Sequence, residues 1–204
     1  QLVTPTQTQN AMIRTHVFPC ALPKDAADAF NRESGRVYTR ALVEHYRVYR
    51  QTGHWLSPAA LEKLVDFYDA QDGQERLLHA HSIDAAEQGF PKACKTARAN
   101  RDDGAHYPHK RKFWRTTIWK NTSLRKRDGA LLLARARGQD SVQLMLPSNL
   151  ASIPAASFAE MRLVSLSSTK PLTWARSPTL IFERASFFSS PPVGAKILVV
   201  VSTS

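Results

Sequence analysis

Apolar and polar residues alternate in two parts of the chain, on either side of a long stretch that has a different period. Met12 to Phe18 alternates residue by residue, as a half-buried strand does, and Pro19 ends the run. From about residue 24 to residue 100 the apolar positions recur at helical spacing instead. From residue 113 the two-residue period returns, with many β-branched and aromatic side chains. The pattern predicts one strand, then helices, then several strands.

The first two helices have clear boundaries. Helical spacing runs from Asp25 to about Arg50 and is interrupted only by Gly35, so one long helix or two helices joined near this glycine are expected. Ser57 followed by Pro58 is typical of an N-cap with proline at the first helical position. A second helix is therefore expected to begin at Pro58.

Two further helices complete the expected block. Asp72 followed by Glu75 three residues later is similar to a capping box, which predicts a third helix from there to Gly89. A shorter fourth helix is expected from Pro91 to about Asn100. Residues 24–100 are thus predicted to be all helical.

The later strands are separated by turn residues. Asp128-Gly129 supplies the two positive-φ positions of a type I′ hairpin turn. The apolar run Ile197 to Val201 is either another strand or an aggregation-prone end. The expected strands are 113–120, 124–127, 130–134, 142–146 and 161–166.

A lone first strand cannot bury its apolar side unaided. It is therefore expected to join the later strands in one sheet or small antiparallel β-barrel, with the helices as an insertion, which is an α+β fold. The expected domains are residues 12–20 plus 105–166 for the barrel, 21–104 for the helices and 167–204 for an irregular tail.

Positive charge is concentrated in one stretch. The formal net charge is +11, and residues 92–127 hold 12 Lys and Arg against 2 Asp and Glu. A basic block beside a near-neutral one is typical of a polyanion-binding protein and favours nucleic acid as the partner. The alternatives are a solvated basic face and an anionic membrane surface. A membrane partner would require an amphipathic helix with a clean apolar face, which this block lacks.

Cationic and aromatic side chains interleave between His106 and Lys120. Cations contact phosphates, and exposed rings on a sheet give bases a stacking surface. Strand alternation sends Trp114 and Trp119 to opposite faces, so one ring is expected at the ligand and the other in the core. The alternative for any single ring is that it belongs to the core. The candidate nucleic-acid-binding residues are Lys92, Lys95, Arg98, Arg101, Tyr107, Lys110, Arg111, Lys112, Trp114, Arg115, Trp119, Lys120, Arg125, Lys126 and Arg127.

Three of these candidates define a ridge on the expected fourth helix. Lys92, Lys95 and Arg98 are spaced three apart and therefore share one face, and Arg101 follows them. Such a ridge can follow a phosphate backbone. An ordinary solvated helix face is the alternative.

No catalytic, metal or cofactor site is expected. The pairs His79 with His81 and His106 with His109 are weak candidates for metal binding or acid-base RNA cleavage. Two positions on a helix separated by one residue, such as His79 and His81, point to different sides, and neither a Cys nor a carboxylate lies at ligand spacing beside His106 or His109. Metal-dependent phosphodiester hydrolysis usually requires convergent carboxylates. After Asp140 the only acids are Glu160 and Glu183.

The sequence also indicates a compartment. Cys20 and Cys94 are far apart and in unlike contexts, so they suggest neither a zinc ribbon nor a disulfide framework. The first residues do not resemble a signal peptide, and no window reaches the ~18 apolar residues of a membrane span. We expect a cytoplasmic protein without a membrane partner.

Five segments together carry a resemblance to a known family. They are the opening strand Arg14 to Pro19, the segment Arg36 to Leu42, the basic strand Lys110 to Lys120, the Arg127-Asp128-Gly129 hairpin and the strand Leu144 to Pro147. Through these segments, residues 12–164 resemble the amino-terminal half of the OrfB-type transposase proteins (TnpB), which are RNA-guided nucleases of insertion sequences related to type V CRISPR effectors. Arg36 to Leu42 is similar to the family's Val-Tyr-Asn-x-Ala-Leu helix, with Thr39 in place of Asn.

In that family, the opening and later strands build an oligonucleotide-binding-like wedge barrel, and the helices between them form a recognition lobe. A RuvC-like nuclease with a zinc ribbon follows. The resemblance implies guide RNA and target DNA as partners of this chain. It ends near Val164, and residues 165–204 offer neither the catalytic acids nor the paired cysteines.

The expected protein is therefore a truncated, nucleic-acid-binding fragment of a transposon-encoded TnpB-like protein, without a nuclease centre. Its tail is expected to be out-of-frame or disordered sequence. The first alternative is a self-contained regulator that binds RNA or DNA. The second is a small nuclease that uses His106 or His109.

Overall fold

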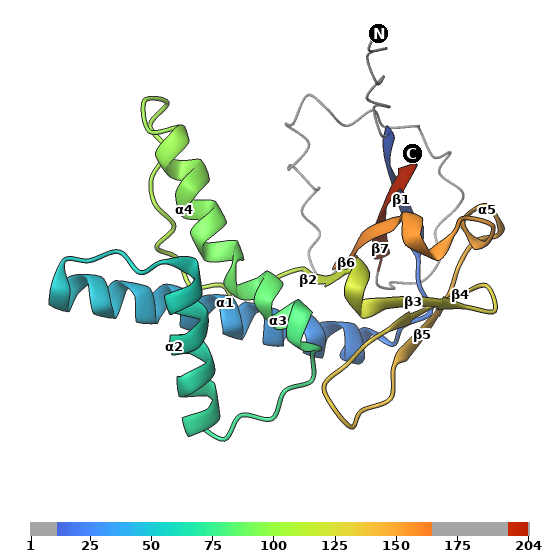
Figure 1. Ribbon diagram of the computed structural model, residues 1–204, viewed down its shortest axis with the longest axis horizontal. Helices are drawn as coiled ribbons and strands as arrows, with labels where there is room; N and C mark the ends of the chain where they lie inside the picture. The colour runs from blue at the N-terminus through green and yellow to red at the C-terminus, as the bar shows by residue number, and fades with distance from the viewer. Residues whose placement is uncertain (1–11, 165–195, 204) are drawn as a thin grey trace, which may run out of the picture.

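The elements follow the predicted order of one strand, a helical block and further strands (Figure 1). The computed structural model describes residues 12–164 and 196–203, and the side chains of residues 14–163. The strands are β1 (Met12–Pro19), β2 (Thr117–Lys120), β3 (Leu124–Arg127), β4 (Ala130–Leu133), β5 (Val142–Met145), β6 (Phe158–Val164) and β7 (Lys196–Thr203). The helices are α1 (Lys24–Thr52), α2 (Pro58–Gln71), α3 (Ala80–Glu87), α4 (Gly89–Ala99) and α5 (Ser148–Ala151), with 3-10 turns η1 (Asn121–Ser123) and η2 (Ala155–Ser157). Helices and sheets both contribute, as expected.

The first helix is a single one of 29 residues. Gly35 lies inside it without dividing it, and the helix ends at Thr52, where Gly53 is the C-cap with a φ of 72° that only glycine adopts readily. The second helix begins as predicted at Pro58, and the Ser57 side chain accepts a hydrogen bond from the Ala60 amide.

The predicted start of the third helix is wrong. Asp72 lies at the carboxyl end of α2 instead, and Gly73 follows it with a φ of 62°. A left-handed residue cannot continue the helix, so the chain leaves it there. The third helix, α3, begins only at Ala80, where His79 is the N-cap.

Helix α4 begins two residues before the predicted start. Its first residue is Gly89, and Pro91 lies within the first turn, where no backbone donor is required. The helix ends at Ala99, close to the predicted end.

The strands form two antiparallel sheets rather than one. Their orders are β1-β7-β6-β2 and β3-β4-β5. The first strand does join later strands, as expected, through its pairing with β7. Within the described ranges the two sheets remain separate and no closed barrel is formed, so the barrel stays a prediction.

The end of the chain differs from the expected irregular tail. Strand β7 lies between β1 and β6 and pairs antiparallel with both, for example His16 with Val199 and Met161 with Val199. The apolar run Ile197 to Val201 is thus a central strand of the sheet. Its backbone is paired along both edges, so it is not left open to pair with another chain. Residues 167–195 of the expected tail lie outside the described residues.

The hairpin and the last strands lie close to their predicted positions. Strands β3 and β4 flank Asp128 and Gly129, whose φ values of 50° and 74° are those of a type I′ turn. Strand β5 matches its prediction, and β6 begins three residues earlier than predicted, at Phe158. Strand β2 is shorter than predicted because residues 113–116 contact α1 instead of a strand.

Two hydrophobic clusters hold these elements together. The larger one joins both sheets to α1 and α3 and includes Phe30, Trp119 and Leu133. The smaller one lies among α1, α2 and α4 and includes Tyr38 and Phe90. Helix α1 contributes to both clusters, so it is the common support of the helical block and the sheets.

Candidate nucleic-acid interface

The segment between α4 and β2 lies extended along α1. We call residues 108–116 the strap. The Tyr46 hydroxyl donates a hydrogen bond to the Pro108 carbonyl over 3.0 Å. Further along, the Thr39 hydroxyl donates to the carbonyl of Lys112 and accepts from its amide, both over 3.0 Å. The Thr39 side chain therefore satisfies both the amide and the carbonyl of Lys112, which are not paired with a strand.

The strap continues past Lys112 towards the start of α1. The Arg115 amide donates to the Asn31 carbonyl over 3.0 Å, and the Asn31 side chain accepts from the Thr117 amide over 2.9 Å. Between these contacts the strap crosses Gly35, where an added Cβ would lie 2.5 Å from the Phe113 backbone. As the strap advances from residue 108 to residue 115, its contacts on α1 move back from Tyr46 to Asn31. The strap therefore runs antiparallel to α1.

The side chains of residues 110–114, in the middle of the strap, are exposed. Lys110, Arg111 and Lys112 are all exposed. Phe113 is 73% exposed and Trp114 is 37% exposed. A backbone held in this way is preorganised for binding, because the ligand has to order only the exposed side chains and not the backbone.

An open groove of about 870 Å³ lies between α1 and the strap. Its lining includes five arginines, namely Arg32, Arg36, Arg40, Arg47 and Arg111, together with Phe113 and Trp114. Four of these arginines belong to α1 and were missed by the sequence analysis, because acidic residues make the helical block near-neutral. Arg32, Arg36 and Arg40 are spaced four residues apart, which places them on one face of a helix. This spacing was the sequence signal that could have identified them.

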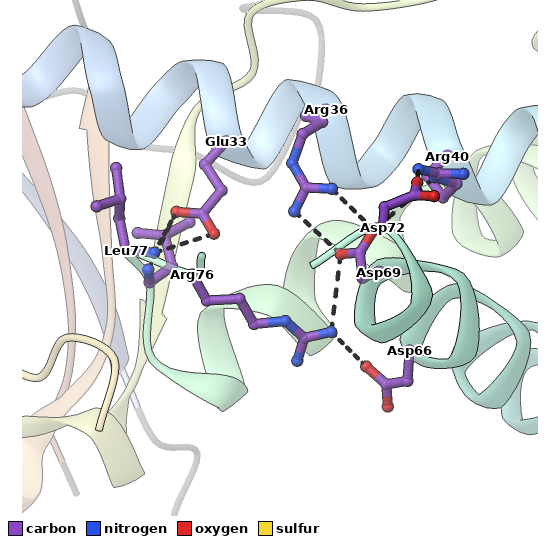
Figure 2. A network of polar contacts seen from close by, with 9 residues as sticks. Glu33, Arg36, Arg40, Asp66, Asp69, Asp72, Arg76 and Leu77 are labelled. Carbon is purple, nitrogen blue, oxygen red and sulfur yellow. Dashed lines mark hydrogen bonds and ion pairs between the residues drawn. The ribbon is translucent and has the colours of Figure 1, made fainter. Parts of the chain in front are cut away.

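Carboxylates pair with the arginines along this part of α1 (Figure 2). Arg36 makes a two-pronged contact with Asp69, over 2.8 and 3.0 Å, and the Asp69 side chain is 1% exposed. Arg76 reaches Asp66 over 2.7 Å and Asp69 over 3.7 Å. These charge-assisted contacts tie α1, α2 and the following connection together.

The neighbouring arginines are paired in the same way. Arg40 contacts Asp72, and Arg47 lies 3.0 Å from a Glu44 carboxylate oxygen. Asp72 therefore ends α2 and pairs with an arginine of α1. This ion pair is a second reason why Asp72 does not begin a helix.

Glu33 holds the connection between α2 and α3. Its carboxylate accepts from the amides of Leu77 and Leu78, over distances of 3.0 to 3.2 Å. Burial raises the pKa of Glu33, while these amides and the Arg36 charge oppose the rise. Glu33 is thus a structural acid beneath the groove.

Arg32 and Arg111 differ from the other groove arginines. Within the described part of the chain neither forms an ion pair. The Arg32 guanidinium lies 5.1 Å from the centre of the Trp114 ring, a cation–π distance. The positive charge available to a ligand is therefore at the strap side of the groove.

Two of the candidate contact residues, Trp119 and Arg115, turn towards the interior. Trp119 is 0% exposed, and its indole N–H donates to the Ala134 carbonyl over 3.0 Å. It is the core ring of the tryptophan pair. The Arg115 guanidinium lies 4.3 Å from the Tyr38 ring centre, and burial lowers the Arg115 pKa. Trp119 therefore stabilises the core, whereas the half-buried Arg115 packs its guanidinium against Tyr38.

Tyr107 is half-buried at the start of the strap. Its ring centre lies 5.0 Å from that of Trp55, and it packs against the smaller hydrophobic cluster. Tyr107 therefore anchors the strap from one side.

The predicted ridge on α4 is present. Lys92, Lys95 and Arg98 are exposed on this helix, and Arg101 is exposed just after it. Figure 1 shows α4 and the β3–β4 hairpin at opposite ends of the view. The basic stretch of the sequence is thus divided among the α4 ridge, the strap and the hairpin.

The basic residues near the hairpin are not equivalent. Arg125 and Arg127 are exposed, and Lys120 is half-buried. The Lys126 ammonium instead donates to the carbonyls of Ala151 and, over 2.6 Å, Ile153. Lys126 is therefore occupied by the backbone that ends α5.

The histidines and acids do not gather into a metal-binding group within residues 14–163. His79 and His81 do not point apart as expected: their ring centres lie 5.1 Å apart, because His79 is the N-cap and accepts from the His81 amide. His106 and His109 are exposed. Glu160 pairs with Arg162 over 2.5 Å, and Glu183 lies outside the described residues.

Both cysteines are free thiols in the structure, and burial raises the pKa of Cys94 to about 11. In the described ranges, every helix is too short or too polar to cross a bilayer.

No protein-family model matches the chain, and a search of curated proteins finds no match.

Proposed function

We propose that this chain binds RNA or DNA. The observation that carries the proposal is the strap, where Lys110, Arg111 and Lys112 project to solvent from a backbone held by Thr39. Three adjacent cations on a fixed backbone can contact successive phosphates without the backbone first being ordered. The exposed ridge on α4 extends the basic surface beyond the strap.

We further propose that the chain is the nucleic-acid-binding part of a TnpB-like transposon protein, with guide RNA and target DNA as ligands and without the nuclease centre. The order of elements supports this proposal, because a first strand shares a sheet with β6 and β2 across an inserted helical block. In this proposal the two sheets correspond to the oligonucleotide-binding-like wedge barrel, and α1 to α4 correspond to the recognition lobe.

One observation favours the alternative of a self-contained RNA- or DNA-binding regulator. Strand β7 is paired on both edges, with β1 and with β6. A strand in that position completes a sheet, whereas out-of-frame sequence has no reason to fit one. The two proposals share the nucleic-acid surface and differ in the origin of the last residues.

Filter binding of the full chain to labelled single-stranded and duplex oligonucleotides, at several salt concentrations, tests the shared claim. With about six phosphate contacts, log K should fall against log salt with a slope of roughly −4 on single strands and −5 on duplex. A flat response, or no binding at low salt, would contradict the proposal.

A further inference from the structure

We infer that the strap side of the α1 groove is a site for an unpaired nucleotide within single-stranded RNA or DNA. The base would stack on Phe113 and Trp114, and the adjacent phosphate would contact Arg32 and Arg111. This inference rests on the proposed function and adds a location and a strand preference to it.

The distribution of charge favours the strap side of the groove as the phosphate-binding side. Arg36, Arg40 and Arg47 line it too, but each has a carboxylate partner. A phosphate would have to displace a bonded carboxylate to reach them. Arg32 and Arg111 have no such partner among the described residues, so a phosphate meets them without breaking an ion pair.

The exposed rings indicate what lies beside the phosphate. Phe113 is the most exposed large apolar side chain of those described, at 73%, and adjoins Trp114. Arg32 already stacks on Trp114, and guanidinium and aromatic planes are the surfaces on which unpaired bases stack. In a duplex the base faces are covered by neighbouring bases, so this contact requires an unpaired nucleotide.

The size and support of the groove fit such a ligand. About 870 Å³ is in the range of pockets that hold drug-sized molecules, and the groove is open enough for a chain to continue past it. The strap cannot retreat towards α1, because the Phe113 backbone already approaches Gly35 closely. The rings are therefore presented from a fixed position.

The test compares a 12-nucleotide single-stranded oligo(U) with a blunt duplex of the same length, using the full chain. Phe113→Ala and Arg32→Gln should each weaken single-strand binding by about tenfold or more, since stacking contributes strongly per base. Duplex binding should change less than threefold. Lys95→Gln, on the α4 ridge, is the matched control and should weaken both ligands equally. Thermal melts by circular dichroism verify that each variant is folded.

A second readout does not depend on affinity alone. Saturating oligo(U) should quench tryptophan fluorescence in the wild type, and Trp114→Phe should remove most of the quenching while keeping a stacking ring. If wild-type binding occurs but Phe113→Ala and Arg32→Gln leave single-strand affinity unchanged, or weaken duplex binding equally, this inference is wrong and the proposed function stands. If the wild type binds neither ligand at low salt, both are wrong.

Discussion

The strap and the β3–β4 hairpin carry nearly the same cationic sequence but expose it differently. The strap has Lys110 to Lys112 and the hairpin has Arg125 to Arg127. In the hairpin, pairing with β4 forces successive side chains to opposite faces, so Lys126 turns inward to backbone carbonyls. In the strap, α1 binds the backbone through Thr39, and all three cations remain exposed.

The comparison shows that the element to which the backbone of a charged segment is hydrogen-bonded determines which of its side chains reach solvent. A strand partner allows only alternate side chains to reach one face. A helix that contacts the backbone at separated points imposes no such alternation. The strap therefore offers a denser line of charge than the hairpin does.

The largest expected effect distinguishes Trp119 of β2 from Trp114 of the strap. Trp119→Ala should lower the free energy of unfolding by about 3 to 5 kcal/mol, because it empties a fully buried site. Trp114→Ala should change stability by less than about 1 kcal/mol but weaken single-strand binding by ~1 to 3 kcal/mol. Chemical denaturation and binding titrations measure the two effects. Equal loss of stability in both variants would contradict the assignment.

The next effect tests the contact between strap and helix. Gly35→Ala should cost about 1 to 3 kcal/mol of stability and displace the strap, because the new Cβ would lie 2.5 Å from the Phe113 backbone. Gly89→Ala is the matched control, since its new Cβ would meet the tip of the Arg115 side chain, which can shift. Denaturation of both variants distinguishes them, and a greater loss for Gly89→Ala would contradict this description.

Protonation of His45, which lies in α1, should lower the free energy of unfolding. His45 is 2% exposed, and burial lowers its pKa below the ordinary 6.5. Its neutral form stabilises the fold above pH 6.5, and this contribution is lost as the pH falls from 6.5 towards the folded pKa. The His45 contribution to the free energy of unfolding should then decline by at most about 1.4 kcal/mol per pH unit.

His45→Phe is the variant that isolates this effect, because Phe is apolar and His45 already packs against Phe90 and Trp55. Burial raises the pKa of Glu87 to about 8, which favours the folded state as the pH falls in both proteins. Denaturation between pH 7 and pH 5 should therefore show that the variant loses less stability, or gains more, than the wild type does. Identical slopes would exclude His45 as the source.

The smallest effect concerns the hairpin. Lys126→Met should lower stability by about 1 to 2 kcal/mol, because the carbonyls of Ala151 and Ile153 lose their donor. Arg125→Gln, at an exposed position of the same strand, should change stability by less than about 0.5 kcal/mol. Thermal melts compare them, and equal melting temperatures would show that the Lys126 hydrogen bonds contribute nothing.

Local signals in the sequence were sufficient for several elements. Ser57 with Pro58 and Asp128 with Gly129 determine a cap and a turn through their own backbone geometry, so both were predicted correctly. Asp72 with Glu75 gave the same kind of local signal. It failed because Asp72 binds Arg40 from a distant part of the chain.

The candidate site depended more on distant contacts. The basic and aromatic composition of residues 110–114 identified the strap, but it was predicted as a strand, because the Thr39 and Asn31 contacts that hold it are separated from it by 73 or more residues. Arg32 was not identified, since only the packing of the strap on α1 brings it to Trp114.

The most direct test of the central claim is the salt dependence of oligo(U) binding after removal of the strap charges. Lys110→Gln, Arg111→Gln and Lys112→Gln are combined in one variant. The control combines Lys24→Gln, Lys63→Gln and Arg137→Gln, which removes the same charge from exposed positions elsewhere.

If the strap cations bind phosphates, the slope of log K against log salt should become shallower by about 2 in the strap variant, because each neutralised phosphate of a single strand contributes about 0.7 to the slope. The control should keep nearly the wild-type slope. Equal slopes and equal affinities for the two variants would show that only net charge matters, and would contradict a nucleic-acid site on the strap.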